Sequence, residues 1–197
     1  MHIKIAVLAS GAGSNFKALV SGDTAPGIVD ILLTDNEEAG ALKLAAELGV
    51  EARYMYPGKY RTRFGIREEE LWAEYLLGRG VELVCLAGLM RIIKGPLLDA
   101  FPGKIMNIHP SLLPSFPGLD AQGQAFNYGV KVAGCTVHYV DGGTDTGPII
   151  LQEPVQVLDS DTRDSLAARI LKREHEIYSM AVKAHCRGRA VYSKVVR

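Results

Sequence analysis

The chain has 197 residues, which suits one well-buried α/β domain and is too short for two large ones. Its 22 basic residues balance 22 acidic ones, so no strong field favours nucleic acid or an anionic membrane, and no apolar run approaches the roughly 20 residues of a membrane helix. The start lacks a signal-type cleavage region and the three cysteines form no Cys-x-x-Cys pair, so we expect a cytoplasmic protein without disulfides or a zinc site.

The first strand and the turn after it predict an anion-binding site. Residues 3–8 are an apolar run with β-branched members, which indicates a central strand buried on both faces. Its turn, Ser10-Gly11-Ala12-Gly13-Ser14-Asn15, leads into a helix that Ser14 and Asn15 can cap, with free N–H groups directed at an anion. Taken alone, the turn fits phosphate binding and plain turn chemistry about equally well.

Strands and helices alternate along the rest of the first half. Strands are expected at 29–33, 52–56, 83–88 and 105–108, with helices at 41–48, 68–77 and 96–101. Asp35 follows the second strand where a Rossmann protein keeps its ribose-binding acid, although we favour an acid that ends a strand and caps a turn. The basic run 59–64 is typical of a solvated face. The apolar run 89–93 follows a strand end, where it suits either a flat aromatic ligand or packing beneath the next loop.

The second half predicts a hairpin and a long final helix. A helix is expected at 122–128, strands at 136–140 and 149–157 with a glycine-rich turn between them, a helix from Asp161 or Thr162 to about Arg187, and a last small strand from Val191. The fold class is therefore α/β, with a mostly parallel Rossmann-like sheet, helices on both faces and an antiparallel hairpin in the C-terminal part. We expect residues 1–197 to form a single domain.

Three polar residues are the best catalytic candidates. His109 lies at the end of a strand, and Asn107 points to the same side of an extended chain. An imidazole can move protons near neutral pH, and an amide can donate a hydrogen bond to an oxyanion. Asp145 could orient His109, or it could only shape the hairpin turn together with Asp141. His138 is interpreted as a structural histidine or a neighbour of the catalytic groups.

These motifs together resemble a known enzyme family. The turn 10–15, Leu86-Ala87-Gly88-Leu89-Met90-Arg91-Ile92-Ile93, Asn107-Ile108-His109-Pro110-Ser111-Leu112-Leu113-Pro114 and Asp145-Thr146-Gly147-Pro148-Ile149-Ile150 are similar, in content and order, to those of the folate-dependent phosphoribosylglycinamide formyltransferases. The resemblance runs nearly end to end. It implies transfer of a formyl group from 10-formyltetrahydrofolate to the amine of glycinamide ribonucleotide in purine biosynthesis, by a monomer or homodimer acting on small molecules without a metal.

The resemblance also assigns roles to residues. It implies that Asn107, His109 and Asp145 are the catalytic residues. It assigns substrate binding, with the phosphate on the glycine-rich turn, to Gly11, Ala12, Gly13, Ser14, Asn15 and Glu174. It assigns folate binding to Arg63, Met90, Arg91, Ile92, Ile93, Asn107, Asp141, Gly142, Gly143, Thr144 and Asp145. Arg63 is chosen from Arg61, Arg63 and Arg67 in a loop that departs from the family pattern. Ala12 and the segment 120–123 also depart from it, which bears on substrate affinity.

Other functions compete with this one. A methionyl-tRNA formyltransferase or a formyltetrahydrofolate hydrolase shares the catalytic core, but each usually carries a further domain, and the balanced charge disfavours tRNA. A Rossmann module that binds a dinucleotide through Gly11 and Gly13 without chemistry would leave Asn107, His109 and Asp145 unexplained.

Overall fold

The computed structural model describes residues 2–190, and within them seven strands form one mixed sheet in the order β3-β2-β1-β4-β5-β6-β7. The strands are β1 (Ile3–Leu8), β2 (Gly27–Thr34), β3 (Glu51–Tyr54), β4 (Leu83–Leu86), β5 (Ile105–His109), β6 (Val132–Tyr139) and β7 (Ile149–Gln156). The helices are α1 (Ser14–Ser21), α2 (Gly40–Leu48), α3 (Ile66–Gly78), α4 (Pro96–Ala100), α5 (Ala121–Tyr128) and α6 (Arg163–Cys186).

The parallel part of the sheet reverses its strand order between β1 and β4. The chain moves outward from β1 to β2 and β3 on one side, then returns to place β4 and β5 on the other side, with all neighbouring pairs parallel. In such sheets a crevice opens beyond the carboxyl ends of the two strands at the reversal, because their connections leave in opposite directions. The turn after β1 and the loop after β4 flank this crevice.

The last three strands are antiparallel. β6 pairs with both β5 and β7, and its residue His138 lies opposite Asn107 of β5. The expected hairpin is confirmed, although β6 begins at Val132, earlier than the alternating pattern indicated. Because β6 runs antiparallel to β5, its end at Tyr139 pairs with Met106 near the start of β5, and the loop that follows must fold back to bring Asp145 to His109.

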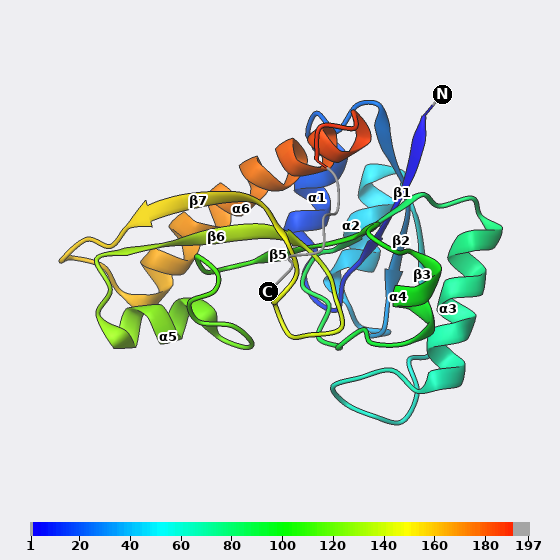
Figure 1. The fold of residues 1–197 in the computed structure, drawn as a ribbon, viewed down its shortest axis with the longest axis horizontal. Coiled ribbons are helices and arrows are strands. Elements are labelled where there is room, and N and C mark those ends of the chain that lie inside the picture. Colours follow the sequence, from blue (N-terminus) through cyan, green and yellow to red (C-terminus); the bar gives the residue numbers. More distant parts are fainter. Residues whose placement is uncertain (1, 191–197) are drawn as a thin grey trace.

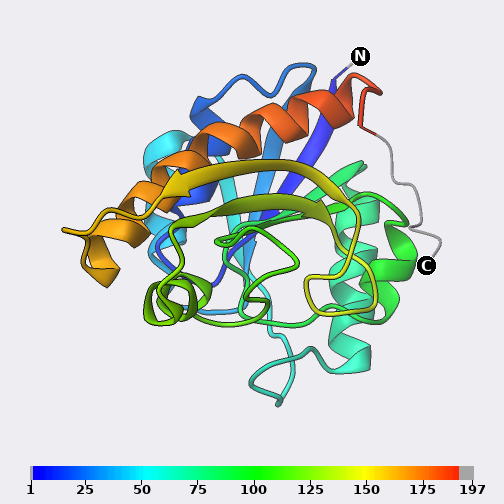
Figure 2. The same cartoon turned by 60° about the vertical axis from the view of Figure 1, so that its left-hand side comes forward.

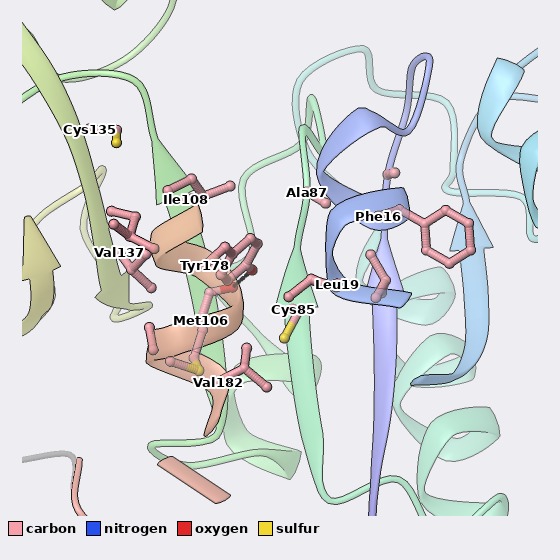
Figure 3. Close-up of a cluster of buried hydrophobic side chains, with 14 of the residues drawn as sticks. Phe16, Leu19, Cys85, Ala87, Met106, Ile108, Cys135, Val137, Tyr178 and Val182 are labelled. Atoms are coloured by element: carbon pink, nitrogen blue, oxygen red, sulfur yellow. Dashed lines mark hydrogen bonds between the residues drawn. The ribbon is translucent and has the colours of Figure 1, made fainter. Parts of the chain in front are cut away.

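Helices cover both faces of the sheet (Figures 1 and 2). Alternate residues of β1 point to opposite sides: Ile5 and Val7 pack with α1, α2 and α6, whereas Ala6 and Leu8 pack with Trp72 of α3 and with α4. Figure 3 shows the first cluster, in which Tyr178 of α6 lies between β4 and β5. Its hydroxyl donates to the carbonyls of Leu86 and Met106, so the side chain ties α6 to both strands just below the crevice.

The elements agree with those expected from the sequence, apart from shifts at their ends. One local expectation is wrong: Gly13, in the left-handed region with φ 83°, is the N-cap of α1, and no side chain caps this helix. α6 does begin at the expected cap, since the Thr162 side chain accepts from the backbone N–H of Ser165. The strand expected from Val191 lies outside the described residues.

Candidate active site

A cleft of about 670 Å³ lies beyond the carboxyl ends of β1, β4 and β5, and it is closed on one side by the loop after β6. Its walls come from the loop after β4, the end of β5, the segment before α5 and one face of α6. The lining includes Asn15, Thr62, Gly88 to Ile93, Asn107 to Pro110, Gly118 to Asp120, Gln122, His138, Asp141, Gly143 to Asp145, Ala167, Ala168, Leu171 and Glu174.

β5 delivers Asn107 and His109 into this cleft from the same side of the strand. His109 is 4% exposed, and its two ring nitrogens both face acceptors. Nε2 is 2.9 Å from the carbonyl oxygen of Phe116, and Nδ1 is 3.5 Å from Oδ2 of Asp145. Both contacts are satisfied together when the ring carries two protons, so the geometry suits an imidazolium.

The carboxylate of Asp145 meets two histidines and one backbone amide. The Gly118 N–H donates to Oδ2 at 2.8 Å, and His138 Nε2 is 3.6 Å from Oδ1. Burial raises the pKa of Asp145, but the His138 contact, the Gly118 hydrogen bond and the charge of His109 outweigh it, so the net pKa is lowered. Asp145 has φ 54°, a left-handed conformation that costs energy in a non-glycine residue and that the surrounding contacts must hold.

His138 orients the amide of Asn107. Its Nδ1 lies 2.8 Å from the carbonyl oxygen of Tyr139, and its Nε2 lies 3.2 Å from Asn107 Nδ2. The amide nitrogen has a second N–H for a bound group. The interpretation of His138 as a neighbour of the candidate catalytic groups therefore agrees with its contacts.

The glycine-rich turn is built for close backbone packing. A Cβ on Gly13 would lie 2.9 Å from the Cβ of Ala41, and the left-handed φ also favours glycine there. Of the six residues expected at the substrate, Asn15 and Glu174 line the cleft, whereas Gly11, Ala12 and Gly13 do not. Ser14 lies at a separate groove between α1 and α6.

Asn15 and Glu174 form a buried polar pair at the floor of the cleft. Asn15 Nδ2 donates to Glu174 Oε2 at 2.7 Å. Asn15 Oδ1 and Glu174 Oε1 are buried without a hydrogen-bond partner among the described residues, which is costly unless a ligand supplies one. Burial raises the pKa of Glu174, and the Asn15 hydrogen bond opposes that shift only in part.

The loop after β4 forms the apolar wall of the cleft. Met90 is 57% exposed and Ile92 40%, whereas Ile93 is 3% exposed and packs in the core beneath α3. The Arg91 guanidinium binds Asp35 rather than projecting freely. Arg63 stacks on the ring of Tyr60, 3.9 Å from its centroid, and is absent from the cleft lining. Asp35 thus neither caps a turn nor is free to bind a ribose.

The hairpin loop contains one residue that shapes the turn and one that faces the cleft centre. Asp141 Oδ1 accepts from the Gly143 N–H at 2.9 Å and from Thr146 Oγ1 at 2.7 Å, which is ordinary turn chemistry. Asp145 instead faces His109. Asp141, Gly143 and Thr144 line the cleft, and Gly142 does not.

Two backbone groups complete the candidate site, and residue type does not predict them. The Phe116 carbonyl and the Gly118 amide hold His109 and Asp145 from a loop whose Phe116 has φ 53°. Ser111 supports this loop, because its hydroxyl donates to the Ser115 carbonyl at 2.6 Å. The run of prolines after His109 was a sign of a shaped loop, but it does not reveal which backbone groups turn inward.

Metal-ligating residues do not gather at this site. Among residues 2–190, no three His, Cys, Asp or Glu side chains are arranged to hold a metal ion, and the three cysteines are buried thiols. Within the same range, no helix has the length and apolar character needed to cross a membrane.

The protein has a Rossmann-like sheet with a small-molecule cleft at its strand reversal, and an amide, an imidazole and a carboxylate converge in that cleft. Together these features define an α/β enzyme of the group-transfer type. The family model described as formyl transferase matches residues 3–182, so the chain belongs to the formyl transferase family.

Named relatives agree with this assignment. The chain is 45% identical over 183 residues to phosphoribosylglycinamide formyltransferase of Bacillus subtilis, which covers 91% of this chain and 93% of the relative. It is 39% identical to the human trifunctional purine biosynthetic protein adenosine-3, covering 94% of this chain and 18% of that protein. The crystal structure of glycinamide ribonucleotide transformylase 1 from Symbiobacterium toebii has a TM-score of 0.92 and 49% identity, covering 98% of this chain and 92% of that one.

Proposed function

We propose that this protein transfers the formyl group of 10-formyltetrahydrofolate to the amine of glycinamide ribonucleotide, giving formylglycinamide ribonucleotide and tetrahydrofolate in purine biosynthesis. The observation that carries the proposal is the convergence of Asn107, His109 and Asp145, with His109 Nδ1 3.5 Å from the Asp145 carboxylate. The names of the relatives supply the substrates.

The cleft has one polar half and one apolar half that fit the two substrates. Near the glycine-rich turn, Asn15 Oδ1 and Glu174 Oε1 are buried acceptors without partners among the described residues, which suits the hydroxyls of a ribose. The first N–H groups of α1 have no partner within the helix, which suits the phosphate of this substrate. Near the loop after β4, Met90 and Ile92 offer apolar surface to the flat ring of the folate, which carries the formyl group on a nitrogen outside that ring.

The three polar residues divide the work of acyl transfer. The Asn107 amide, oriented by His138, donates to the oxygen that becomes negative when the amine adds to the formyl carbon. His109 in its imidazolium form stabilises the same charge, and Asp145 holds the imidazolium in place. Asp145 also takes part in moving the proton from the attacking amine to the leaving nitrogen. No covalent bond to the protein is needed.

A direct assay tests the proposal. Purified protein with glycinamide ribonucleotide and 10-formyltetrahydrofolate should yield formylated ribonucleotide and tetrahydrofolate in equal amounts. A second reaction without the ribonucleotide should release no formate, whereas sustained formate release would identify a hydrolase. Absence of formylated product with both substrates present would refute the proposed activity.

A further inference from the structure

Arg91 lies in the loop that forms the folate half of the cleft, but its guanidinium is engaged inside the protein. Nε is 2.6 Å from Oδ2 of Asp35, and only 11% of the Arg91 side chain and 6% of the Asp35 side chain are exposed. A charge-assisted hydrogen bond at this degree of burial holds both partners in one geometry, because either group alone would be a buried charge.

The same carboxylate reaches the glycine-rich turn. Asp35 Oδ1 accepts from the hydroxyl of Ser10 at 2.6 Å, and that hydroxyl oxygen accepts from the backbone N–H of Met90 at 2.9 Å. Ser10 follows β1, Asp35 follows β2, and Met90 follows β4. The network therefore closes across the strand reversal and joins the turn assigned to the substrate phosphate to the loop assigned to folate.

Arg91 also anchors the loop 60–63. Its Nη1 donates to the carbonyl of Tyr60 and, at 3.0 Å, to the carbonyl of Arg63. The neighbouring Ile92 N–H donates to the Thr62 carbonyl at 2.9 Å, which forms a parallel bridge between the two segments. Thr62 lines the cleft, so a displaced loop would alter the folate half directly.

We infer that Arg91 is a positioning residue: with Asp35 and Ser10 it sets the loops 89–93 and 60–63 against the glycine-rich turn, and it affects the binding of formyl-folate through those loops. The inference rests on the proposed function for the identity of the ligand. In this role the guanidinium lies between protein segments, because its planar set of N–H donors can bind a carboxylate and two carbonyls at once. A lysine ammonium keeps the charge but not this geometry.

Arg91→Lys is the main test, and Arg79→Lys is its matched control. Arg79 makes a similar bridge, with Asp30 at 3.0 Å and Glu51 at 2.9 Å, but its partners lie on the strands β2 and β3, apart from the cleft lining. Two measurements are made on each protein. The first is hydrogen–deuterium exchange without ligand, and the second is steady-state kinetics with each substrate varied in turn.

We expect Arg91→Lys to speed exchange in residues 59–64 and to raise KM for formyl-folate about tenfold, as loss of charge-assisted hydrogen bonds to a binding loop predicts. KM for the ribonucleotide and kcat should stay within about threefold, because the catalytic residues on β5 are untouched. Arg79→Lys should change neither KM. Combining Arg91→Lys with Asp35→Asn should raise KM by less than the product of the single effects, because the two residues act together.

Three outcomes would overturn the inference: unchanged exchange in 59–64, an equal rise in both KM values, or a fall in kcat with KM for formyl-folate unchanged. If the wild-type protein forms no formylated product, the proposed function fails, yet the exchange comparison still decides whether Arg91 holds the loop.

Discussion

Asp145→Asn tests the charge that the site places beside His109. The substitution is nearly isosteric and keeps an oxygen for the Gly118 N–H, but it removes the negative charge 3.5 Å from His109 Nδ1. Coulomb's law with an effective dielectric constant of about 20 to 40 gives about 2.4 to 4.7 kcal/mol for unit charges at this distance. If the imidazolium that stabilises the oxyanion loses all of that energy, kcat falls by up to roughly 60-fold to 3000-fold.

The assay measures kcat and both KM values for formylated product, with thermal unfolding as a check on folding. Asp159→Asn is the matched control, because Asp159 has 98% of its side chain exposed and should leave all three constants unchanged. A protein with Asp145→Asn that kept kcat within about threefold of wild type, with only KM changed, would show that the carboxylate does not act in the chemical step.

The described contacts support three more tests. The rate of formyl transfer should decline as pH falls below about 8, because the attacking amine becomes protonated. Protonation of Asp145 should cause no second decline above pH 3.8, the ordinary pKa of an aspartate, because the pKa of Asp145 is lowered. A rate that did not change between pH 6 and 8 would contradict this expectation. Glu174→Gln should reduce the pH dependence of the free energy of unfolding. Because the pKa of Glu174 is raised in the folded protein, the wild type loses stability as pH rises from 4.5, the ordinary pKa of a glutamate, through the folded pKa. Urea unfolding of both proteins at several pH values measures the difference. Gly13→Ala should lower the free energy of unfolding by about 1 to 3 kcal/mol, because the backbone there is left-handed and the new methyl group would crowd Ala41. The same substitution should raise KM for the ribonucleotide. An unchanged unfolding midpoint would refute the expected loss of stability.

Local patterns were sufficient for the secondary structure and for the catalytic candidates. Apolar runs identified the buried strands, and the alternation rule placed Asn107 and His109 on one side of β5, where the structure has them. Propensity was insufficient at Gly13, where close packing against Ala41 put a glycine at the N-cap in place of the expected polar side chain.

The sequence by itself determined the order of elements, the chemical nature of the site residues and the resemblance that names the reaction, because these depend on spacing and residue type along the chain. Only the tertiary structure decided which groups meet. Asp145 reaches His109 because the loop after β6 folds back along β5, Phe116 and Gly118 contribute backbone atoms that no residue type announces, and Arg91 binds Asp35 across the strand reversal. Contacts between residues far apart in the chain depend on the topology of the sheet, which local patterns do not encode.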